Sequence, residues 1–471
     1  MKYDTSALLR KTEQKLNALK IDELKQLGLL PGAGKYAITL HYPPLNNYPL
    51  ANSKDLLDGL ALSAKDPLGL YLNIPFCINR CHFCHYVVTT TDSTEVKDRY
   101  LNALKKELRL YREHMGIDSI SAEYILVGGG TPTHLSVGQL QAFLEAIYEN
   151  IDLTSCQQFT FDVDPTTLLE KEGLQRLRLL KGHGVDRLTI GVQSLDDRIL
   201  AVMNRAHNAR DVFMAIDQAR RAGFENLCAD LIYGYPGQGM KQWIDTVEGV
   251  IATSIEEIEM YQLNIVSYAS GESILSRGSI DSPIDDNLIY QMRQAAVLLL
   301  EESGYHQNIG RGFSKNPDHC SYYLRNMYSE LHNTAGFGLT SFSCYEDRFM
   351  RNARTFKEYY ALLDQNKLPM TEGKILSKDE RLRKEIILPL KRSKVDKNLY
   401  LKRTGQPVEY LFKDKLEKLV KHGLLEEDQQ SLALTERGNF FADQVCQQFF
   451  DKDFLPFPET DYMQGELIPY G

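Results

Sequence analysis

Short apolar runs rich in β-branched residues alternate with longer stretches of helical periodicity through the middle of the chain. The short runs predict buried parallel strands, and the longer stretches carry the apolar spacing of helices packed by one face. We place strands at 69–74, 123–127, 159–163, 187–192, 227–233 and 259–264. We place helices at 93–114, 139–148, 169–181, 212–222, 241–252 and 287–302. This alternation predicts an α/β fold, a partial (β/α)6 barrel of the TIM type.

The regions on either side of this core divide the chain further. Residues 1–64 form an N-terminal arm with helical spacing over 5–27 and a proline-stiffened segment at 41–49, in which His41 and Tyr42 are candidates for substrate contact. The core spans 65–305, and 306–370 is a linking region on the substrate side. Residues 371–471 predict a helical, winged-helix-like domain, with helices at 379–389 and 409–422 and a hairpin that ends at Leu434.

Composition narrows the class of protein. With 471 residues, 43% hydrophobic and 25% charged, the chain is long enough to bury a large core. Its net charge of −9 argues against broad nucleic-acid binding, and no apolar run is long enough to cross a bilayer. We therefore expect a cytoplasmic enzyme with a small-molecule substrate.

Three of the eight cysteines, Cys77, Cys81 and Cys84, follow the first predicted strand in a C-x3-C-x2-C spacing. Thiolates are soft ligands suited to iron–sulfur clusters, and three ligands on a four-iron cluster leave one iron open. Zinc is the competing interpretation, with His82 or His85 as the fourth ligand. Disulfides are disfavoured because the cysteines are dispersed and no apolar secretory segment stands near Met1.

Glycines and short polar residues follow the other predicted strands, where barrels of this kind carry their chemistry. In the run Gly128-Gly129-Gly130-Thr131, the missing Cβ atoms let backbone groups approach a ligand, although a tight turn explains the run equally simply.

The polar candidates at the remaining strand ends are carboxylates, one amide and one arginine. Short carboxylates and amides at neighbouring strand ends accept hydrogen bonds from hydroxyl or ammonium groups, but each also serves as a helix cap. The arginine suits pairing with a carboxylate and is otherwise a solvated surface residue. These candidates are Asp162 or Asp164, Gln193, Asp230 and Arg205.

Together the motifs resemble the oxygen-independent coproporphyrinogen III oxidase family of radical S-adenosylmethionine (SAM) enzymes, from about Tyr71 to the C-terminus. The cysteine spacing is the signature of the superfamily. The family motifs are Tyr71-x-Asn-Ile-Pro-Phe-Cys77, Gly128-Gly-Gly-Thr-Pro-Thr133, Asp162-Val-Asp-Pro165, Asp186-Arg-Leu-Thr-Ile-Gly-Val-Gln-Ser194, Asn204-Arg205 and Asp230-Leu-Ile-Tyr-Gly-Tyr-Pro-Gly-Gln238. Gly336-Phe-Gly338 and the region 376–441 also look like late segments of this family.

The resemblance implies specific roles. The cysteines would ligate a [4Fe-4S] cluster, and SAM would chelate its open iron, with two SAM molecules bound in some members. It further implies a reductant such as flavodoxin or ferredoxin, and we expect a monomer. Tyr71 would lie near the substrate as a proton or hydrogen donor, unless it is a plain packing residue. The residues implied to contact SAM are Gly129, Gly130, Thr131, Asp162, Gln193, Arg205 and Asp230.

Departures from the family pattern gather on the substrate side. Tyr86 stands where coproporphyrinogen oxidases carry a further cysteine, Asn73 where they carry a histidine, and Asp162 where they carry Glu. Our leading hypothesis is therefore methyl or methylene transfer, or cyclopropanation, at an sp2 carbon from a second SAM. Oxidative decarboxylation of a porphyrinogen, or other tetrapyrrole chemistry, is the second hypothesis, and a heme-binding or heme-delivery protein is the third.

Overall fold

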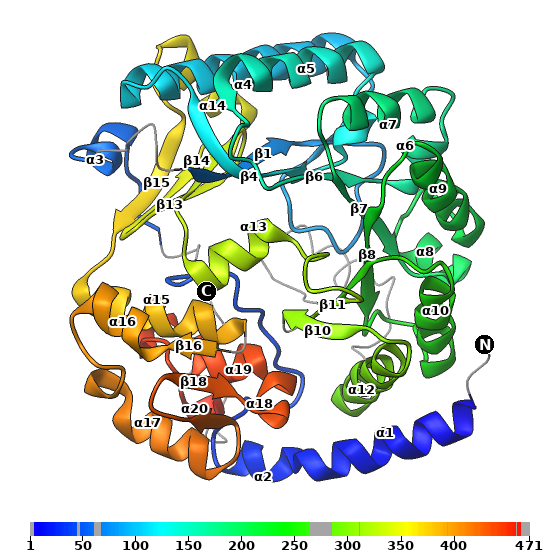
Figure 1. Ribbon diagram of the computed structural model, residues 1–471, viewed down its shortest axis with the longest axis vertical. Helices are drawn as coiled ribbons and strands as arrows, with labels where there is room; N and C mark the ends of the chain where they lie inside the picture. Colours follow the sequence, from blue (N-terminus) through cyan, green and yellow to red (C-terminus); the bar gives the residue numbers. More distant parts are fainter. Residues whose placement is uncertain are drawn as a thin grey trace.

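Six parallel strands form the centre of the molecule, as the sequence predicts. The computed structural model describes residues 4–44, 48–60, 67–263, 285–309, 311–392, 394–457 and 459–462. In spatial order the strands are β9 (Glu257–Gln262), β8 (Asn226–Tyr233), β7 (Arg187–Gln193), β6 (Gln158–Val163), β4 (Ile120–Gly129) and β1 (Leu68–Ile74). Figure 1 shows this curved sheet, from blue through cyan to green. The predicted fold class is confirmed, and Asn264, the last predicted strand residue, lies outside the described residues.

Further strands from residues 306–370 extend the sheet at both ends. Next to β1, β12 (Thr334–Phe337) pairs in parallel and leads through antiparallel β13 (Phe342–Tyr345) and β14 (Arg348–Asn352) to β15 (Met370–Ile375). Next to β9, β11 (Gly312–Ser314) pairs antiparallel and turns into β10 (His306–Ile309). This region therefore belongs to the same sheet as the core. Short strands β2 (Phe76–Cys77), β3 (Thr89–Thr90) and β5 (Ile151–Asp152) complete the set of described strands in this part.

Helices cover the outer face of the sheet (Figure 1). They are α4 (Thr94–Met115), α5 (Val137–Asn150), α6 (Pro165–Leu169), α7 (Gly173–Gly182), α8 (Asp197–Val202), α9 (Ala209–Arg221), α10 (Met240–Ala252) and α12 (Asp286–Glu302). Further helical elements lie between or beyond them: η2 (Pro132–His134), α13 (Tyr322–Arg325), η3 (Asn326–Glu330), α3 (Ser53–Leu57) and α14 (Phe356–Asp364).

The helix predicted at 169–181 is present as α7 but begins at Gly173, and a separate short helix, α6, ends at Leu169 before it. Asp164 caps α6 by accepting from the Thr166 amide at 2.8 Å, and Pro165 occupies its first turn. The chain then turns so tightly that a Cβ on Gly173 would stand 1.8 Å from the Leu168 carbonyl oxygen. Glycine is therefore required where α7 begins.

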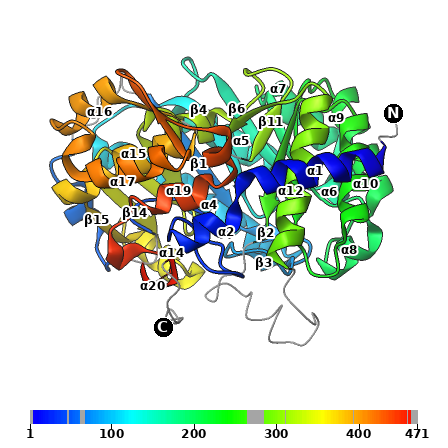
Figure 2. The same ribbon diagram turned by 90° about the horizontal axis from the view of Figure 1, so that it is seen from below.

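The N-terminal arm also contains two helices where the sequence predicts one. Lys20 adopts a left-handed φ of 49° and separates α1 (Thr5–Leu19) from α2 (Ile21–Gln26). Helix α1 packs along α12, as Figure 2 shows. Residues 45–47 of the proline-stiffened segment lie outside the described residues.

The C-terminal region has the predicted winged-helix-like composition. Helices α15 (Lys378–Lys391), α16 (Lys397–Thr404) and α17 (Glu409–Lys421) accompany a three-stranded sheet of β16 (Lys394–Asp396), β18 (Ser431–Leu434) and β17 (Leu425–Glu427). The chain continues through α18 (Glu436–Phe440), α19 (Ala442–Gln447), η4 (Lys452–Phe454) and α20 (Glu459–Tyr462).

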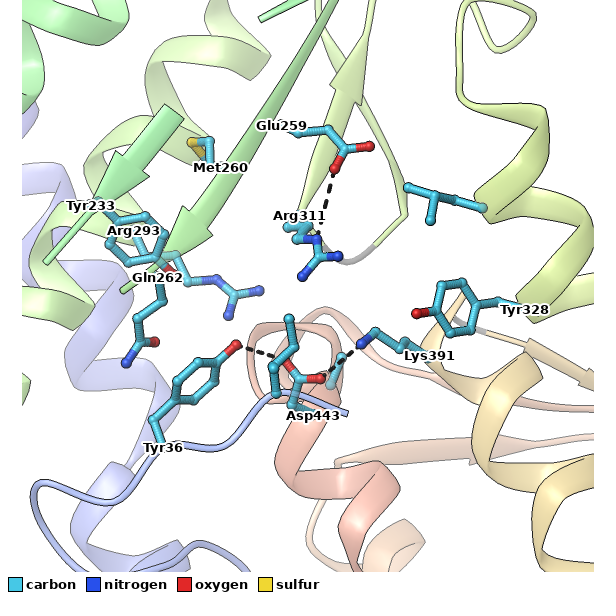
Figure 3. Close-up of a pocket in the computed structure, with 13 residues that line it drawn as sticks. Tyr36, Tyr233, Glu259, Met260, Gln262, Arg293, Arg311, Tyr328, Lys391 and Asp443 are labelled. Atoms are coloured by element: carbon cyan, nitrogen blue, oxygen red, sulfur yellow. Dashed lines mark hydrogen bonds and ion pairs between the residues drawn. The ribbon is translucent and has the colours of Figure 1, made fainter. Parts of the chain in front are cut away.

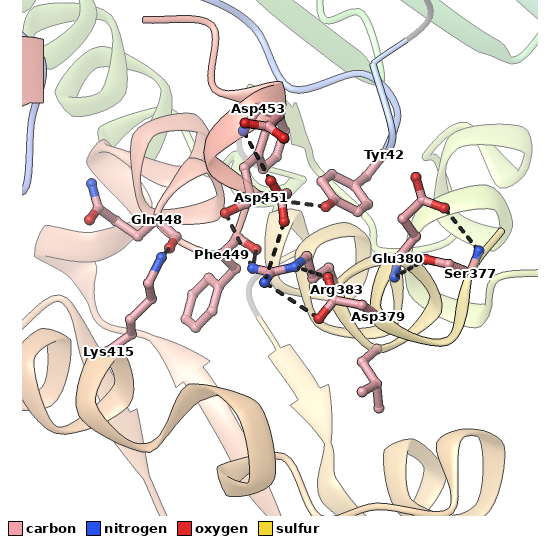
Figure 4. Close-up of polar contacts among 12 residues, drawn as sticks. Tyr42, Ser377, Asp379, Glu380, Arg383, Lys415, Gln448, Phe449, Asp451 and Asp453 are labelled. Atoms are coloured by element: carbon pink, nitrogen blue, oxygen red, sulfur yellow. Dashed lines mark hydrogen bonds and ion pairs between the residues drawn. The ribbon is translucent and has the colours of Figure 1, made fainter. Parts of the chain in front are cut away.

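Arg383 and Tyr42 join separate segments of this region by hydrogen bonds (Figure 4). The guanidinium of Arg383 donates to Asp379 at 2.6 Å and to the Phe449 carbonyl at 2.9 Å, so that it joins α15 to the end of α19. The buried Tyr42 hydroxyl accepts from the Asp451 amide at 3.2 Å. The N-terminal arm is thus part of the C-terminal core, and Tyr42, a candidate for substrate contact, has a packing role here.

A buried carboxyl, Glu107, ties α4 to the β12 end of the sheet. It accepts hydrogen bonds from the Gly338 amide at 2.8 Å, the Tyr359 hydroxyl at 2.6 Å and the Asn352 side-chain amide at 2.6 Å. Burial raises the pKa of Glu107 to about 7, although all three donors oppose this shift. Since the folded pKa exceeds the unfolded one, this group contributes most to stability at low pH and loses that contribution as pH rises through about 7.

We expect Tyr359→Phe to lower the free energy of unfolding by about 1–3 kcal/mol, because a buried acceptor loses its donor. The loss should be larger at pH 8 than at pH 5, since removal of the hydroxyl raises the pKa of Glu107 further and leaves a less solvated carboxylate. Urea unfolding at both pH values measures this difference.

Tyr148→Phe is the matched control, because the Tyr148 hydroxyl donates to the His183 carbonyl at 2.9 Å on a side chain that is 51% exposed. Tyr148→Phe should lower the free energy of unfolding only slightly at either pH. Equal losses for the two variants, or a Tyr359→Phe loss that does not change with pH, would contradict the assigned role of Glu107.

Candidate active site

The three predicted cluster cysteines lie together just beyond the C-terminal end of β1. Cys77 ends β2, and the amide of Cys84 donates to the Cys81 carbonyl at 3.2 Å in the loop that follows. Both Cys81 and Cys84 are close enough to influence the pKa of Cys77, and all three are partly exposed and free of disulfides.

The chain segment after β7 holds this loop in place. The Asn204 side chain donates to the Arg80 carbonyl at 2.9 Å, and the His82 amide donates to the Met203 carbonyl at 3.1 Å. The His82 ring nitrogen Nδ1 lies 2.8 Å from the Val202 carbonyl oxygen, within hydrogen-bonding distance. Segments about 120 residues apart in sequence are therefore joined by three contacts at the cysteine loop.

The thiols have the chemistry that an iron–sulfur cluster requires. Burial raises the pKa of Cys77 to about 12, and the Thr131 hydroxyl, 3.8 Å from its sulfur, opposes that shift. Arg205 Nη1 lies 3.3 Å from the Cys81 sulfur. Because thiolates bind metals, a cationic cluster would supply the charge that keeps these sulfurs deprotonated, while the neighbouring donors stabilise them. The residues present fit a [4Fe-4S] cluster with three protein ligands.

The glycine run after β4 brings the backbone against neighbouring strands. The Gly130 amide donates to the Ile74 carbonyl at 2.9 Å, and the Thr131 amide donates to the Phe76 carbonyl at 2.7 Å. A Cβ on Gly130 would stand 2.7 Å from both of these carbonyl oxygens, and Gly129 has a φ of 99°. The run therefore anchors the cysteine loop, and the Gly130 N–H is already used within the protein.

Partly buried carboxyls line the strand ends next to these glycines. Asp162 on β6 is close enough that a Cβ on Gly128 would meet its Oδ2 at 2.2 Å. Burial raises the pKa of Asp162 to about 7, opposed by the charge of Arg187. Asp230 on β8 is the register neighbour of Glu259 on β9, and burial together with the Glu259 charge raises the pKa of Asp230 well above its ordinary value. A cation bound here would be stabilised by these carboxyls and would lower their pKa values.

Arg205 and Gln193 lie at the end of β7. Arg205 Nη2 donates to Asp164 Oδ2 at 2.5 Å and to the Gly191 carbonyl at 2.7 Å. Although burial opposes ionisation, the guanidinium of Arg205 lowers the pKa of Asp164. Gln193 is buried with a left-handed φ of 65°, and a Cβ on Gly191 would lie 3.1 Å from its amide nitrogen and 3.2 Å from Arg205 Nη2. Arg205 therefore connects the cysteine loop with the ends of β6 and β7.

Tyr71 lies on β1 beside the glycine run. Its hydroxyl donates to the Asn73 side-chain oxygen at 3.3 Å, its ring centroid lies 6.1 Å from that of Tyr323, and burial raises its pKa well above the ordinary value. The structure thus places a neutral phenol in the middle of β1, close to Gly129, whose added Cβ would stand 3.1 Å from the Tyr71 oxygen.

Several charged residues of this region were missed by the sequence reasoning. Arg187 donates to Glu257 at 3.1 Å beneath the site, and both side chains are buried. Glu259 accepts from the Tyr261 hydroxyl at 2.5 Å and lies 3.8 Å from Arg311. The sequence does contain a signal for these residues, namely charged residues inside apolar strands. Such residues are rarely buried without a partner, so they predict a buried ion pair.

Comparison with known families gives two matches along the chain. The model described as the radical SAM superfamily matches residues 72–250, which hold the cysteines and all of the strand-end candidates. The HemN C-terminal domain matches residues 376–441, the winged-helix-like region.

Curated relatives match over most of their length. The chain is 27% identical to the heme chaperone HemW of Bacillus subtilis over 80% of this chain and 98% of that protein. It is 28% identical to the oxygen-independent coproporphyrinogen III oxidase of Salmonella typhimurium over 86% of this chain and 92% of that one.

A solved structure has the same fold. The coproporphyrinogen III oxidase HemN of Escherichia coli superposes with a TM-score of 0.76 at 22% identity, covering 88% of this chain and 96% of that one. Among the described residues, no helix is long and apolar enough to span a membrane. The chain therefore carries a radical SAM superfamily domain at residues 72–250 and a HemN C-terminal domain at residues 376–441, and its relatives include proteins named oxygen-independent coproporphyrinogen III oxidase.

Proposed function

We propose that this chain binds a [4Fe-4S] cluster through Cys77, Cys81 and Cys84 and reductively cleaves SAM to abstract hydrogen from a small organic substrate. The convergence of the three cysteines beside the glycine run and the strand-end carboxyls carries the proposal. When bound, the cluster supplies the electron that splits SAM into methionine and a 5′-deoxyadenosyl radical.

The residues around the cysteines have distinct tasks in this proposal. The partly buried carboxyls Asp162 and Asp230 have raised pKa values and would accept hydrogen bonds from the ammonium or ribose hydroxyls of SAM. Arg205 would position the cysteine loop through Cys81 and would hold Asp164 ionised. Tyr71 would face the substrate as a neutral donor.

Transfer of a methyl or methylene group from a second SAM is our first proposal for the substrate chemistry. It is supported by Tyr86, which stands where coproporphyrinogen oxidases carry a further cysteine, and by Asn73 in place of their histidine. It is also supported by the partly buried carboxyls of β6 and β8 and the buried carboxyls of β9, because SAM carries both a sulfonium and an ammonium charge.

The named relatives support a second proposal. Similarity to coproporphyrinogen III oxidases over 86% of this chain favours oxidation of a porphyrinogen propionate or related tetrapyrrole chemistry. Similarity to HemW over 80% of the chain makes heme binding and delivery the third.

Anaerobic turnover of the reconstituted protein with a reductant and SAM separates these proposals. We expect 5′-deoxyadenosine in every radical reaction, and S-adenosylhomocysteine beside it if a second SAM donates the carbon. With coproporphyrinogen III present, 5′-deoxyadenosine together with a decarboxylated product and no S-adenosylhomocysteine would favour the second proposal. Neither SAM product, from protein with an intact cluster, would contradict SAM cleavage as the function.

Replacement of the cysteines one at a time by Ala should reduce the iron and acid-labile sulfide retained after reconstitution by more than half in each case. The matched control is Cys156→Ala, because Cys156 is also partly exposed but contacts the Gln158 carbonyl far from the loop. Full retention of iron by a Cys81→Ala variant, or equal loss in the Cys156→Ala control, would contradict the assignment of the ligands.

A further inference from the structure

Two partly buried arginines next to the sheet differ in what their guanidinium groups contact. Arg311 faces a carboxylate, with its Nε 3.8 Å from Glu259 Oε2 (Figure 3). Arg205 also has a carboxylate partner, Asp164, but its other amino group, Nη1, lies 3.3 Å from the sulfur of Cys81. A charged donor therefore stands directly against one of the cysteines that we assign to the cluster.

Two further acceptors fix the plane of the Arg205 guanidinium. Its Nη2 donates to Asp164 Oδ2 at 2.5 Å and to the Gly191 carbonyl at 2.7 Å. The side chains of Arg205 and Asp164 are only 10% and 13% exposed. Because arginine presents its donors in a rigid, planar fork, these two bonds leave Nη1 directed at Cys81. A rotation of the guanidinium away from the sulfur would break both of them.

The backbone around Arg205 is fixed as well. Asn204 follows α8 in the left-handed conformation, with a φ of 61°, and the Arg205 amide donates to the Leu200 carbonyl at 3.0 Å. The Asn204 side chain donates to the carbonyl of Arg80, the residue directly before Cys81, at 2.9 Å. The distance between the guanidinium and the sulfur is thus set from both sides of the contact.

A cationic hydrogen-bond donor on a ligand sulfur acts on the reduction potential of an iron–sulfur cluster. Reduction adds one negative charge, so a guanidinium N–H beside the sulfur stabilises the reduced form more than the oxidised form. The carboxylate of Asp164 has the opposite effect, because its negative charge disfavours the added electron. Solvent screens neither effect strongly, since both side chains are largely covered.

We propose that Arg205 raises the reduction potential of the cluster by donating to Cys81, and that Asp164 holds the guanidinium in place while limiting its effect. This inference rests on the proposed function and deepens it, because it assigns Arg205 to the electron-transfer step rather than to SAM. In that step one electron passes from a low-potential reductant to the oxidised cluster, and no bond of the protein forms or breaks.

Redox titration of the reconstituted protein without SAM, followed by electron paramagnetic resonance of the reduced cluster, tests the proposal. Arg205→Gln should lower the ratio of reduced to oxidised cluster at least tenfold at a fixed potential, which is a shift of about 59 mV to lower potential. Asp164→Asn should raise that ratio, because the negative charge is removed while the amide oxygen still caps α6. Arg205→Lys should fall between the wild type and Arg205→Gln.

Arg198→Gln is the matched control, because Arg198 lies on α8 and donates to the Gly237 carbonyl at 2.9 Å from an exposed side chain. It removes the same charge and should leave the potential unchanged, since solvent screens that charge. A wild-type potential in Arg205→Gln would overturn the proposal. An Asp164→Asn potential equal to or below that of the wild type would also overturn it, and this outcome decides the question even if Arg205→Gln retains no cluster.

Equilibrium dialysis of SAM against the oxidised, cluster-loaded variants separates this role from a SAM contact. A tenfold loss of SAM affinity in Arg205→Gln with an unchanged potential would overturn the proposal and assign Arg205 to SAM. If the potentials shift as expected while the wild type forms no 5′-deoxyadenosine, the proposed function fails and this inference stands. If the wild type assembles no cluster, both fail.

Discussion

The parallel arrangement of six strands is the constraint on which the site depends. Parallel strands carry their carboxyl ends to one edge, so residues separated by long stretches of sequence meet there. The cysteine loop follows β1, the glycine run follows β4, and Asp162, Gln193 and Asp230 lie at or near the ends of β6, β7 and β8. Without that common edge these groups would not lie close together.

A second set of contacts, around the strand ends, holds the side chains at this edge in position. Arg205 links the Cys81 sulfur, Asp164 and the Gly191 carbonyl, and the buried pair of Arg187 and Glu257 supports the carboxyls from below. Such pairs are strongly destabilising to break, since removal of one member leaves a buried charge. A further pair of opposite charges lies along β9, where Glu259 stands 3.8 Å from Arg311.

The amino-acid sequence predicted those parts of the structure that are determined by residues close together along the chain. Strands and most helices followed from apolar periodicity, and the cysteines and strand-end polar residues from spacing and position. The break between α6 and α7 was missed because it depends on a backbone contact between Gly173 and Leu168, and the break at Lys20 because it depends on one left-handed residue. Gly130 stays a predicted SAM contact, and its N–H donates to the Ile74 carbonyl.

Electron paramagnetic resonance of the reduced, reconstituted protein, recorded with and without SAM, tests whether the three cysteines hold a cluster that binds SAM. We expect a signal of a reduced [4Fe-4S] cluster whose g-values shift when SAM is added, because a cluster with only three cysteine ligands leaves one iron open to it. A cluster whose spectrum is identical with and without saturating SAM, or protein that retains zinc and forms no cluster, would contradict it.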